Sequence, residues 1–277
     1  MLESTNIYAV MSKQKQYRIL FRIDDVNSLT KELKNVSEIF LQRKIPITYA
    51  VEPRNVTDKC VSWLKNLKQE MPELIGITQH GWDHSKYQTG EFDNTRTFEE
   101  QFGDLKRGRN RLKELFGEDF FPMLTIPFGV FNRDTIRAAD QLGFRVFCIH
   151  FNYRLSRRLF YKLGHTFGKI QIFGKKVSNH MRYMPGTNMF EIDSALSFVK
   201  KYKDDYGTEC SMYAFEEMMV DFAKFQKYIT TIVILLHHRY HCNKESLNLV
   251  KRVVEELEKR PEVAFSSYSQ VYREHKG

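Results

Sequence analysis

Short apolar segments alternate with longer amphipathic segments along most of the chain. The short segments have the length of strands and lie at 17–23, 47–51, 74–78, 121–126, 144–149, 231–236 and 263–267. In the longer segments apolar side chains recur every three or four residues, which predicts helices. These predicted helices lie at 28–42, 57–68, 97–116, 134–142, 213–228 and 244–259, and a short helix follows the last strand. Strands that alternate with helices are typical of a parallel sheet, so we predict an α/β fold.

The alternation breaks between residues 150 and 190. This segment is rich in Arg, Tyr, Gly and Phe, and only 169–173 has the pattern of a short strand. The segment is too short to form a second domain with its own core. We therefore predict one domain over 1–277, with a flexible start at 1–16 and an irregular insertion at 150–190, after the fifth strand.

Composition and charge narrow the function further. Hydrophobic residues make up 42% of the 277 residues, enough for a sizeable core. The net charge of +9 comes from dispersed basic residues, with a local excess between Arg145 and Arg182 and no nucleic-acid-binding motif, so we expect no nucleic-acid partner. No signal-like or membrane-spanning apolar run is present, and the four cysteines are widely spaced. We expect a cytoplasmic protein that contacts membranes peripherally at most and has no amphipathic anchor.

Acidic and imidazole side chains follow two predicted strands. Asp24 and Asp25 end the first strand, and His80 and His84 follow the third. In parallel α/β barrels the reacting groups lie at the carboxyl ends of the strands, so these residues should share one face. One Asp and two imidazoles form a common three-ligand set for a divalent cation with open positions. The other Asp can then accept a proton from water, which predicts a metal-dependent hydrolase.

The order of these residues resembles the polysaccharide deacetylase superfamily, also called NodB-homology or carbohydrate esterase family four. The resemblance spans most of the chain and implies a distorted, seven-stranded (β/α) barrel that hydrolyses acetyl groups from amino sugars. Arg22-Ile23-Asp24-Asp25 resembles the first family motif, which implies Asp24 as the base and Asp25 as a metal ligand. His80-Gly81-Trp82-Asp83-His84 resembles the second, which implies His80 and His84 as ligands, with Gly81 in place of a hydroxyl residue.

The third family motif resembles Thr125-Ile126-Pro127-Phe128-Gly129, which retains Pro127, the aromatic residue and the glycine. The resemblance implies that the backbone amide of Phe128 helps to hold the oxyanion. The family arginine that braces the base is missing from this motif. Arg22 and Arg239 are the candidates to replace it, and we also place Pro127 and Arg239 at the substrate side of the site.

The last family motif, Leu-x-His, resembles Leu235-Leu236-His237 and implies His237 as the general acid. His238 also fits if the motif begins one residue later. The fourth family motif, an Asp and Trp group that tunes the acid, has no clear counterpart. Asp193 could replace it by position, but the simpler interpretation is a helix N-cap before Ala195.

These patterns predict an enzyme that removes an N-acetyl or similar acyl group from a sugar or glycan precursor. The expected cofactor is a divalent metal ion, Zn²⁺ first, with Mn, Co, Ni and Fe as alternatives. The expected partner is a carbohydrate or lipid-linked sugar. Formylated sugars and small cyclic amides are alternative substrates. A non-catalytic glycan-binding protein on a degenerate barrel is the alternative of another class, favoured by the missing arginine and disfavoured by the retained ligands and acid/base residues.

Overall fold

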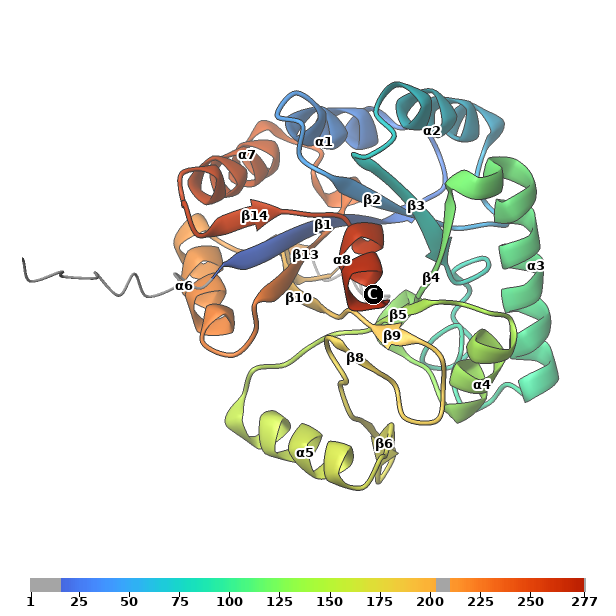
Figure 1. Cartoon of the computed structure of the whole chain (residues 1–277). Helices are drawn as coiled ribbons and strands as arrows, with labels where there is room; N and C mark the ends of the chain where they lie inside the picture. Colours follow the sequence, from blue (N-terminus) through green and yellow to red (C-terminus); the bar gives the residue numbers. More distant parts are fainter. Residues whose placement is uncertain (1–15, 203–209, 277) are drawn as a thin grey trace, which may run out of the picture.

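A curved, mostly parallel sheet organises the protein (Figure 1). The computed structural model describes residues 16–202 and 210–276, so most of the predicted flexible start lies outside the described residues. The strands of the main sheet are β1 (Tyr17–Val26), β2 (Ile47–Val51), β3 (Ile75–His80), β4 (Phe120–Thr125), β5 (Val146–Cys148), β8 (Arg182–Tyr183), β9 (Phe190–Glu191), β10 (Ser194–Ser197), β13 (Thr231–His237) and β14 (Val263–Phe265). Their order is β10-β13-β1-β2-β3-β4-β5-β9-β8, and β14 also pairs with β1.

Residues 190–198 join the two ends of this sheet. The amides of Phe190, Ile192 and Ser194 donate to carbonyls in and beside β5, whereas the amide of Phe198 donates to the Leu235 carbonyl in β13. β10 also pairs in parallel with β13. The sheet therefore curls into the distorted barrel that the sequence predicts, with the β9–β10 segment taking one strand position between β5 and β13.

Helices surround the barrel (Figure 1). They are α1 (Lys31–Leu41), α2 (Asp58–Glu70), α3 (Phe98–Phe116), α4 (Arg133–Gln141), α5 (Leu155–Thr166), α6 (Phe215–Gln226), α7 (Lys244–Glu258) and α8 (Tyr268–Lys276), with 3₁₀ turns η1 (Gly117–Asp119), η2 (Pro127–Gly129) and η3 (His238–Tyr240). Thr30, Thr97, Asn132 and Asn243 cap helix starts by accepting a backbone N–H three residues on. No helix within 16–202 and 210–276 is long and apolar enough to cross a membrane.

Strand side chains alternate between the outer helices and the barrel interior. Along β1, Ile19, Phe21 and Ile23 belong to the large core between strands and helices, whereas Leu20 belongs to a separate interior cluster. Successive strand residues point to opposite faces, so Arg22 and Asp24 share the inward face with Leu20. Helix α8 covers one end of the barrel (Figure 1), and its Tyr268 belongs to the interior cluster, which leaves the carboxyl ends of the strands for the site.

Two expectations about residues 150–200 are wrong. The short strand expected at 169–173 is present as β6 (Gln171–Ile172), but the rest of the insertion is not irregular, because it contains helix α5 and the strand β7 (Lys175–Lys176) that pairs with β6. Asp193 does not cap a helix, because an extended strand, β10, follows it. A further small antiparallel pair, β11 (Val199–Lys201) and β12 (Ser211–Met212), lies beyond β10.

Candidate active site

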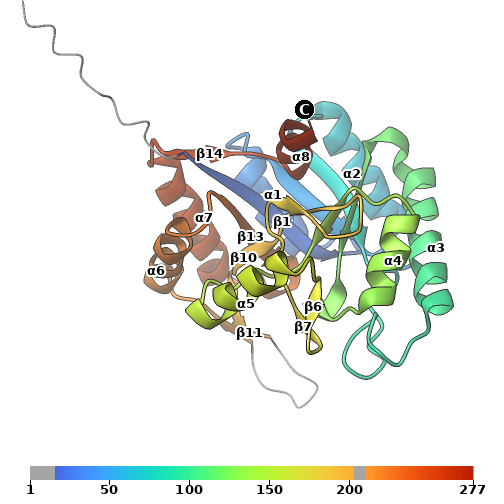
Figure 2. The same ribbon diagram turned by 60° about the horizontal axis from the view of Figure 1, so that its bottom comes forward.

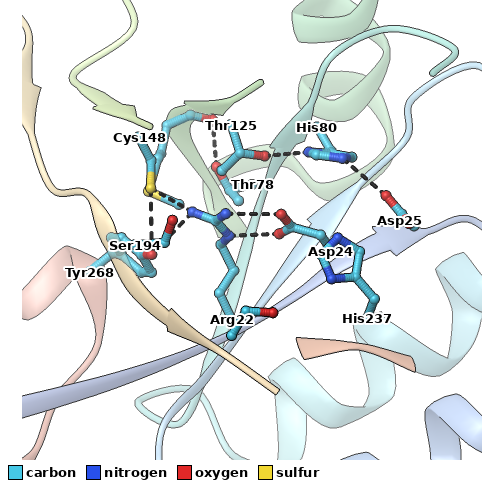
Figure 3. A network of polar contacts seen from close by, with 12 residues as sticks. Arg22, Asp24, Asp25, Thr78, His80, Thr125, Cys148, Ser194, His237 and Tyr268 are labelled. Carbon is cyan, nitrogen blue, oxygen red and sulfur yellow. Dashed lines mark hydrogen bonds and ion pairs between the residues drawn. The ribbon is translucent and has the colours of Figure 1, made fainter. Parts of the chain in front are cut away.

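Arg22 and Asp24 form a buried ion pair inside the barrel (Figure 3). Arg22 Nε and Nη2 donate to the two Asp24 carboxylate oxygens at 2.6 and 2.9 Å, and both side chains are buried. Burial alone raises the pKa of the Asp24 carboxyl, but the Arg22 guanidinium and nearby His80 outweigh it and hold the pKa below its usual value. Asp24 is therefore a carboxylate at neutral pH.

Asp25 reaches the same side of the sheet through an irregularity in β1. The register with β2 shifts between Ile23 and Val26, where two steps along β2 oppose three along β1. Asp25 takes a left-handed backbone conformation with φ of 60°. An extra residue in one strand changes the alternation of its side chains, so Asp24 and Asp25 can both serve one site although they are adjacent.

His80 ends β3 and directs its Nε2 at Asp25. The Thr125 hydroxyl donates to the Gln79 carbonyl at 3.1 Å and lies 2.7 Å from His80 Nδ1. Because that hydroxyl proton is already used, Thr125 accepts from His80 Nδ1–H, and this directs Nε2 toward Asp25. His80 Nε2 lies 3.1 Å from Asp25 Oδ1, and although burial opposes it, the Asp24 and Asp25 carboxylates raise the pKa of the His80 imidazole.

His84 completes a cluster of three residues that could hold a metal ion. Its Nε2 also lies 3.1 Å from Asp25 Oδ1, and the ligand atoms of Asp25, His80 and His84 all lie within 4.8 Å of one another. Two imidazole nitrogens that converge on one carboxylate oxygen fit a divalent cation with nitrogen and oxygen ligands. The cluster opens into a cleft of about 950 Å³ that Asp24 also lines.

Strained backbone gathers around this cluster. Among the described residues, six other than glycine have a left-handed φ, and three of them, Asp25, His84 and Phe128, lie at the site. Such conformations cost about 1–2 kcal/mol each and persist where the surroundings enforce them. The Phe128 ring lies 4.4 Å from the His84 ring, centroid to centroid, and lines the cleft. Pro127, which was expected at the substrate side, is buried and does not line the cleft.

The strand alternation separates His237 from His238. In β13, Val233 belongs to the interior cluster and Leu235 lines the cleft, so His237 is the next inward residue, and it lines the cleft. His238 is buried outside the cleft. Burial lowers the pKa of His237, although the Asp25 and Asp24 carboxylates oppose this.

Tyr202 is a side-chain partner of His237. Its hydroxyl lies 3.4 Å from His237 Nδ1 and 3.0 Å from Ser197 Oγ. Burial raises the pKa of Tyr202 to about 12, so the hydroxyl stays protonated. Asp193 does not serve there, because its carboxylate accepts hydrogen bonds from the Ile149 amide and the Ser178 hydroxyl.

A family model now adds an independent observation. The polysaccharide deacetylase model matches residues 12–147, a range that contains the Asp25, His80 and His84 cluster, Asp24 and Phe128. Over residues 12–147 the chain is therefore similar to the polysaccharide deacetylase family. No curated protein sequence matches the chain significantly.

Solved structures extend the likeness to nearly the whole chain. A candidate polysaccharide deacetylase from Mycobacterium smegmatis has a TM-score of 0.67 at 10% identity, over 97% of this chain and 93% of that one. A PuuE allantoinase has a TM-score of 0.63 at 14% identity, over 95% and 91%. A family 4 acetyl xylan esterase from Clostridium thermocellum, in complex with a cobalt ion, has a TM-score of 0.53 at 11% identity, over 92% and 90%. At such identities, the likeness shows a shared fold.

Of the two candidates for the missing arginine, Arg22 is the one that braces Asp24. Its Nη1 donates to Cys148 Sγ and, at 3.2 Å, to the Tyr268 hydroxyl, so three neighbours fix the guanidinium (Figure 3). The other candidate, Arg239, instead donates to Asp25 Oδ2 at 2.5 Å and is half-exposed in the cleft wall. Cys148 and Tyr268 lie far along the chain from Arg22, so no local sequence signal indicated this network.

Removing the Arg22 charge should raise the pKa of Asp24. In Arg22→Gln, burial continues to raise that pKa while the main opposing charge is gone, so the acid limb of kcat/KM against pH should move up by about 1–3 units. Activity that requires the Asp24 carboxylate is then lost at a higher pH than in the wild type. Arg22→Lys retains the charge without the two-pronged contact and should shift the limb less. An unshifted limb in Arg22→Gln would contradict the brace.

Gly81, the departure in the second deacetylase motif, is explained by Glu91. A Cβ at Gly81 would lie 2.1 Å from Glu91 Oε2 and 2.6 Å from Pro127 Cγ, and Gly81 has a left-handed φ of 54°. Glu91 is fully buried and its Oε1 accepts the amide of Trp82 at 2.6 Å, inside the loop between the two histidine ligands. Burial raises the pKa of Glu91 to about 7. The glycine thus makes room for a carboxyl that holds this loop.

A Gly81→Ala variant should therefore be clearly destabilised. The added Cβ combines left-handed strain with overpacking, which together cost about 2–5 kcal/mol in the free energy of unfolding. Gly168→Ala is the matched control, because Gly168 has a φ of 56° and nothing within 4 Å of the added Cβ. Urea unfolding of both variants separates strain from overlap. Equal losses would show that Glu91 does not exclude a side chain from position 81.

Proposed function

We propose that the protein is a metal-dependent hydrolase that removes an N-acetyl or similar acyl group from a sugar or glycan precursor. The observation that carries this proposal is the convergence of His80 and His84 Nε2 on Asp25 Oδ1, beside the braced Asp24, in one cleft. The polysaccharide deacetylase match to residues 12–147 supports the reaction class. The nitrogen and oxygen donor set suits Zn²⁺ first, and also Mn, Co, Ni or Fe.

Each side chain of the site has a separate role in amide hydrolysis. A divalent cation held by Asp25, His80 and His84 supplies, when bound, polarisation of the carbonyl and a lowered pKa of water. Asp24, kept ionised by Arg22, accepts a proton from the attacking water. The Phe128 backbone N–H donates to the developing oxyanion.

His237 lies on the Asp24 side of the cleft (Figure 3) and donates a proton to the leaving nitrogen. The Tyr202 hydroxyl orients its ring from the other side. Aromatic rings with hydroxyl groups, among them Tyr153, Tyr202 and Tyr240, line the cleft, and such mixed walls suit the apolar and hydroxylated faces of a sugar. A cytoplasmic location stays a prediction.

The test is product release by the purified, zinc-loaded wild type. Acetate should appear from N-acetylated amino sugars, free or lipid-linked, and the same samples should be run with formylated sugars and a cyclic ureide. Product release only from a formylated sugar, or only from the ureide, would show that this class of compound is the substrate in place of an acetylated sugar. Retained sugar binding without release from any substrate would favour the glycan-binding alternative.

A further inference from the structure

Helix α5 and the β6–β7 hairpin form a lobe that projects from the barrel (Figures 1 and 2). We name residues 155–177 the α5 lobe. Its inner face is packed, because Tyr161 and Gly164 are buried and a Cβ at Gly164 would lie 2.4 Å from Val177 Cγ1. The lobe continues directly from Phe151–Arg154, which line the active-site cleft. The inner face of the lobe thus fixes it beside the cleft.

The outer face of α5 is apolar and exposed. Leu155, Leu159 and Leu163 recur every four residues, and they are 66%, 59% and 47% exposed. Residues at this spacing lie along one face of a helix. Phe167 continues the spacing directly after the helix and is also exposed. An exposed stripe of this kind marks a contact site, and it is a candidate amphipathic anchor that the sequence pattern did not show.

Phe173 is exposed at the tip of the hairpin in the same lobe. It lies between β6 and β7, is 97% exposed and has a left-handed φ of 49°. Two-residue hairpin turns favour Asn, Asp or Gly at such a position, and a bulky residue there is strained. A ring that packs on almost nothing does not offset this strain within the folded chain. We therefore expect the Phe173 ring to be stabilised by contact with a partner outside the chain.

The charge around the lobe indicates what that partner is. Residues 141–190 contain nine Lys or Arg and no Asp or Glu. Without these nine, the 43 basic residues of the chain become 34, which equals its number of acidic residues, so this segment accounts for the whole net charge of +9. Six of the nine lie in the α5 lobe itself, which has no Asp or Glu of its own. Exposed apolar side chains on a helix and a hairpin tip, together with basic residues in the same lobe, suit insertion into an anionic lipid surface.

We propose that the α5 lobe docks the protein on an anionic membrane, with its leucines and phenylalanines at the boundary between headgroups and acyl chains. Docking places the cleft wall at 151–154 beside the lipid surface. The consequence for substrate, that the sugar is presented on a lipid, rests on the proposed function. The docking proposal does not rest on that function, because vesicle binding is measured without enzymatic turnover.

The apolar part of the surface is tested by vesicle flotation. Wild type should bind vesicles of phosphatidylcholine with phosphatidylglycerol, bind those of phosphatidylcholine alone far less, and lose binding as salt rises. Leu159→Gln with Leu163→Gln should weaken binding by about tenfold or more. Phe173→Asn should also weaken it while leaving the urea midpoint unchanged or higher, because Asn suits the left-handed turn. Val220→Gln, at another exposed apolar residue, should bind as wild type does.

The basic part is tested by two variants of equal net charge. Replacing Lys162, Lys169 and Lys175 together by Gln should weaken binding about a hundredfold, whereas replacing Lys34, Lys227 and Lys259 should have a much smaller effect. Equal losses in the two variants, or no vesicle binding by the wild type, would overturn the proposal. So would concentration-dependent dimers that the leucine variant abolishes without any vesicle binding, since a second copy would then cover the stripe. If the wild type hydrolyses sugar amides but does not bind vesicles, the docking proposal is refuted and the proposed function is not.

Discussion

Asp24→Asn should lower kcat by about 10²–10⁴-fold, the usual contribution of a general base, while the protein keeps its metal. The substitution preserves the shape of the side chain and removes its ability to accept a proton. The metal should remain because the ligand cluster is Asp25, His80 and His84, and Asp24 lies outside it. Turnover and metal content are measured on the same samples, by product release and elemental analysis.

The control for Asp24→Asn is another buried, ion-paired aspartate. Asp104 is buried and pairs with Arg96 at 2.6 Å, outside the cleft. Asp104→Asn therefore also leaves a buried guanidinium without its charge partner, and both variants should lose stability. Only Asp24→Asn should lose turnover. Substantial activity in Asp24→Asn, or an equal loss in Asp104→Asn, would remove Asp24 as the base.

Much of this site follows from strand alternation alone. Arg22 and Asp24 are two residues apart in one strand and so share a face, which is how the braced base could be predicted from the first motif. The same rule distinguishes His237 from His238, because His237 continues the inward series of Val233 and Leu235. The resemblance implied Asp24 as the base and His237 as the acid, and strand alternation explains why both side chains face the cleft.

The remaining features depend on contacts that no local pattern encodes. Asp25 reaches the cluster only through the irregularity in β1, which adjacent residues in a regular strand would not permit. Tyr202 reaches His237 from a separate loop, and Glu91 fills the space beside Gly81 from further along the same connection between β3 and α3. Neither contact follows from the periodicity of a single strand or helix.

Helix α5 was missed for a different reason. Its exposed stripe includes Leu159 and Leu163, but Phe160 and Tyr161 between them pack inward. Apolar residues on two sides of one helix blur the three-to-four-residue period that identifies an amphipathic helix. The segment therefore seemed irregular, although its composition already contained the unopposed basic charge that distinguishes the lobe.

Replacement of His80 by Ala should abolish stoichiometric metal binding. His80 provides one of three ligands, and its loss leaves Asp25 and His84 too few to hold a cation tightly. Thr125→Val should have a smaller effect, since it removes only the hydroxyl that accepts from His80 Nδ1–H. Changes to such supporting groups reduce metal affinity by about 10–100-fold. The expected order of zinc affinity is wild type, then Thr125→Val, then His80→Ala.

Affinity and stability together test this order. Added Zn²⁺ should raise the Tm of the metal-free wild type, because a ligand that binds only the folded state stabilises it, and the rise should shrink along the same series. His165→Ala is the control, since His165 bonds the Ser178 carbonyl outside the cleft. A His80→Ala protein that still binds one zinc ion with wild-type affinity would refute the cluster as the metal site. It would also remove the physical reason for two imidazoles to converge on the Asp25 carboxylate.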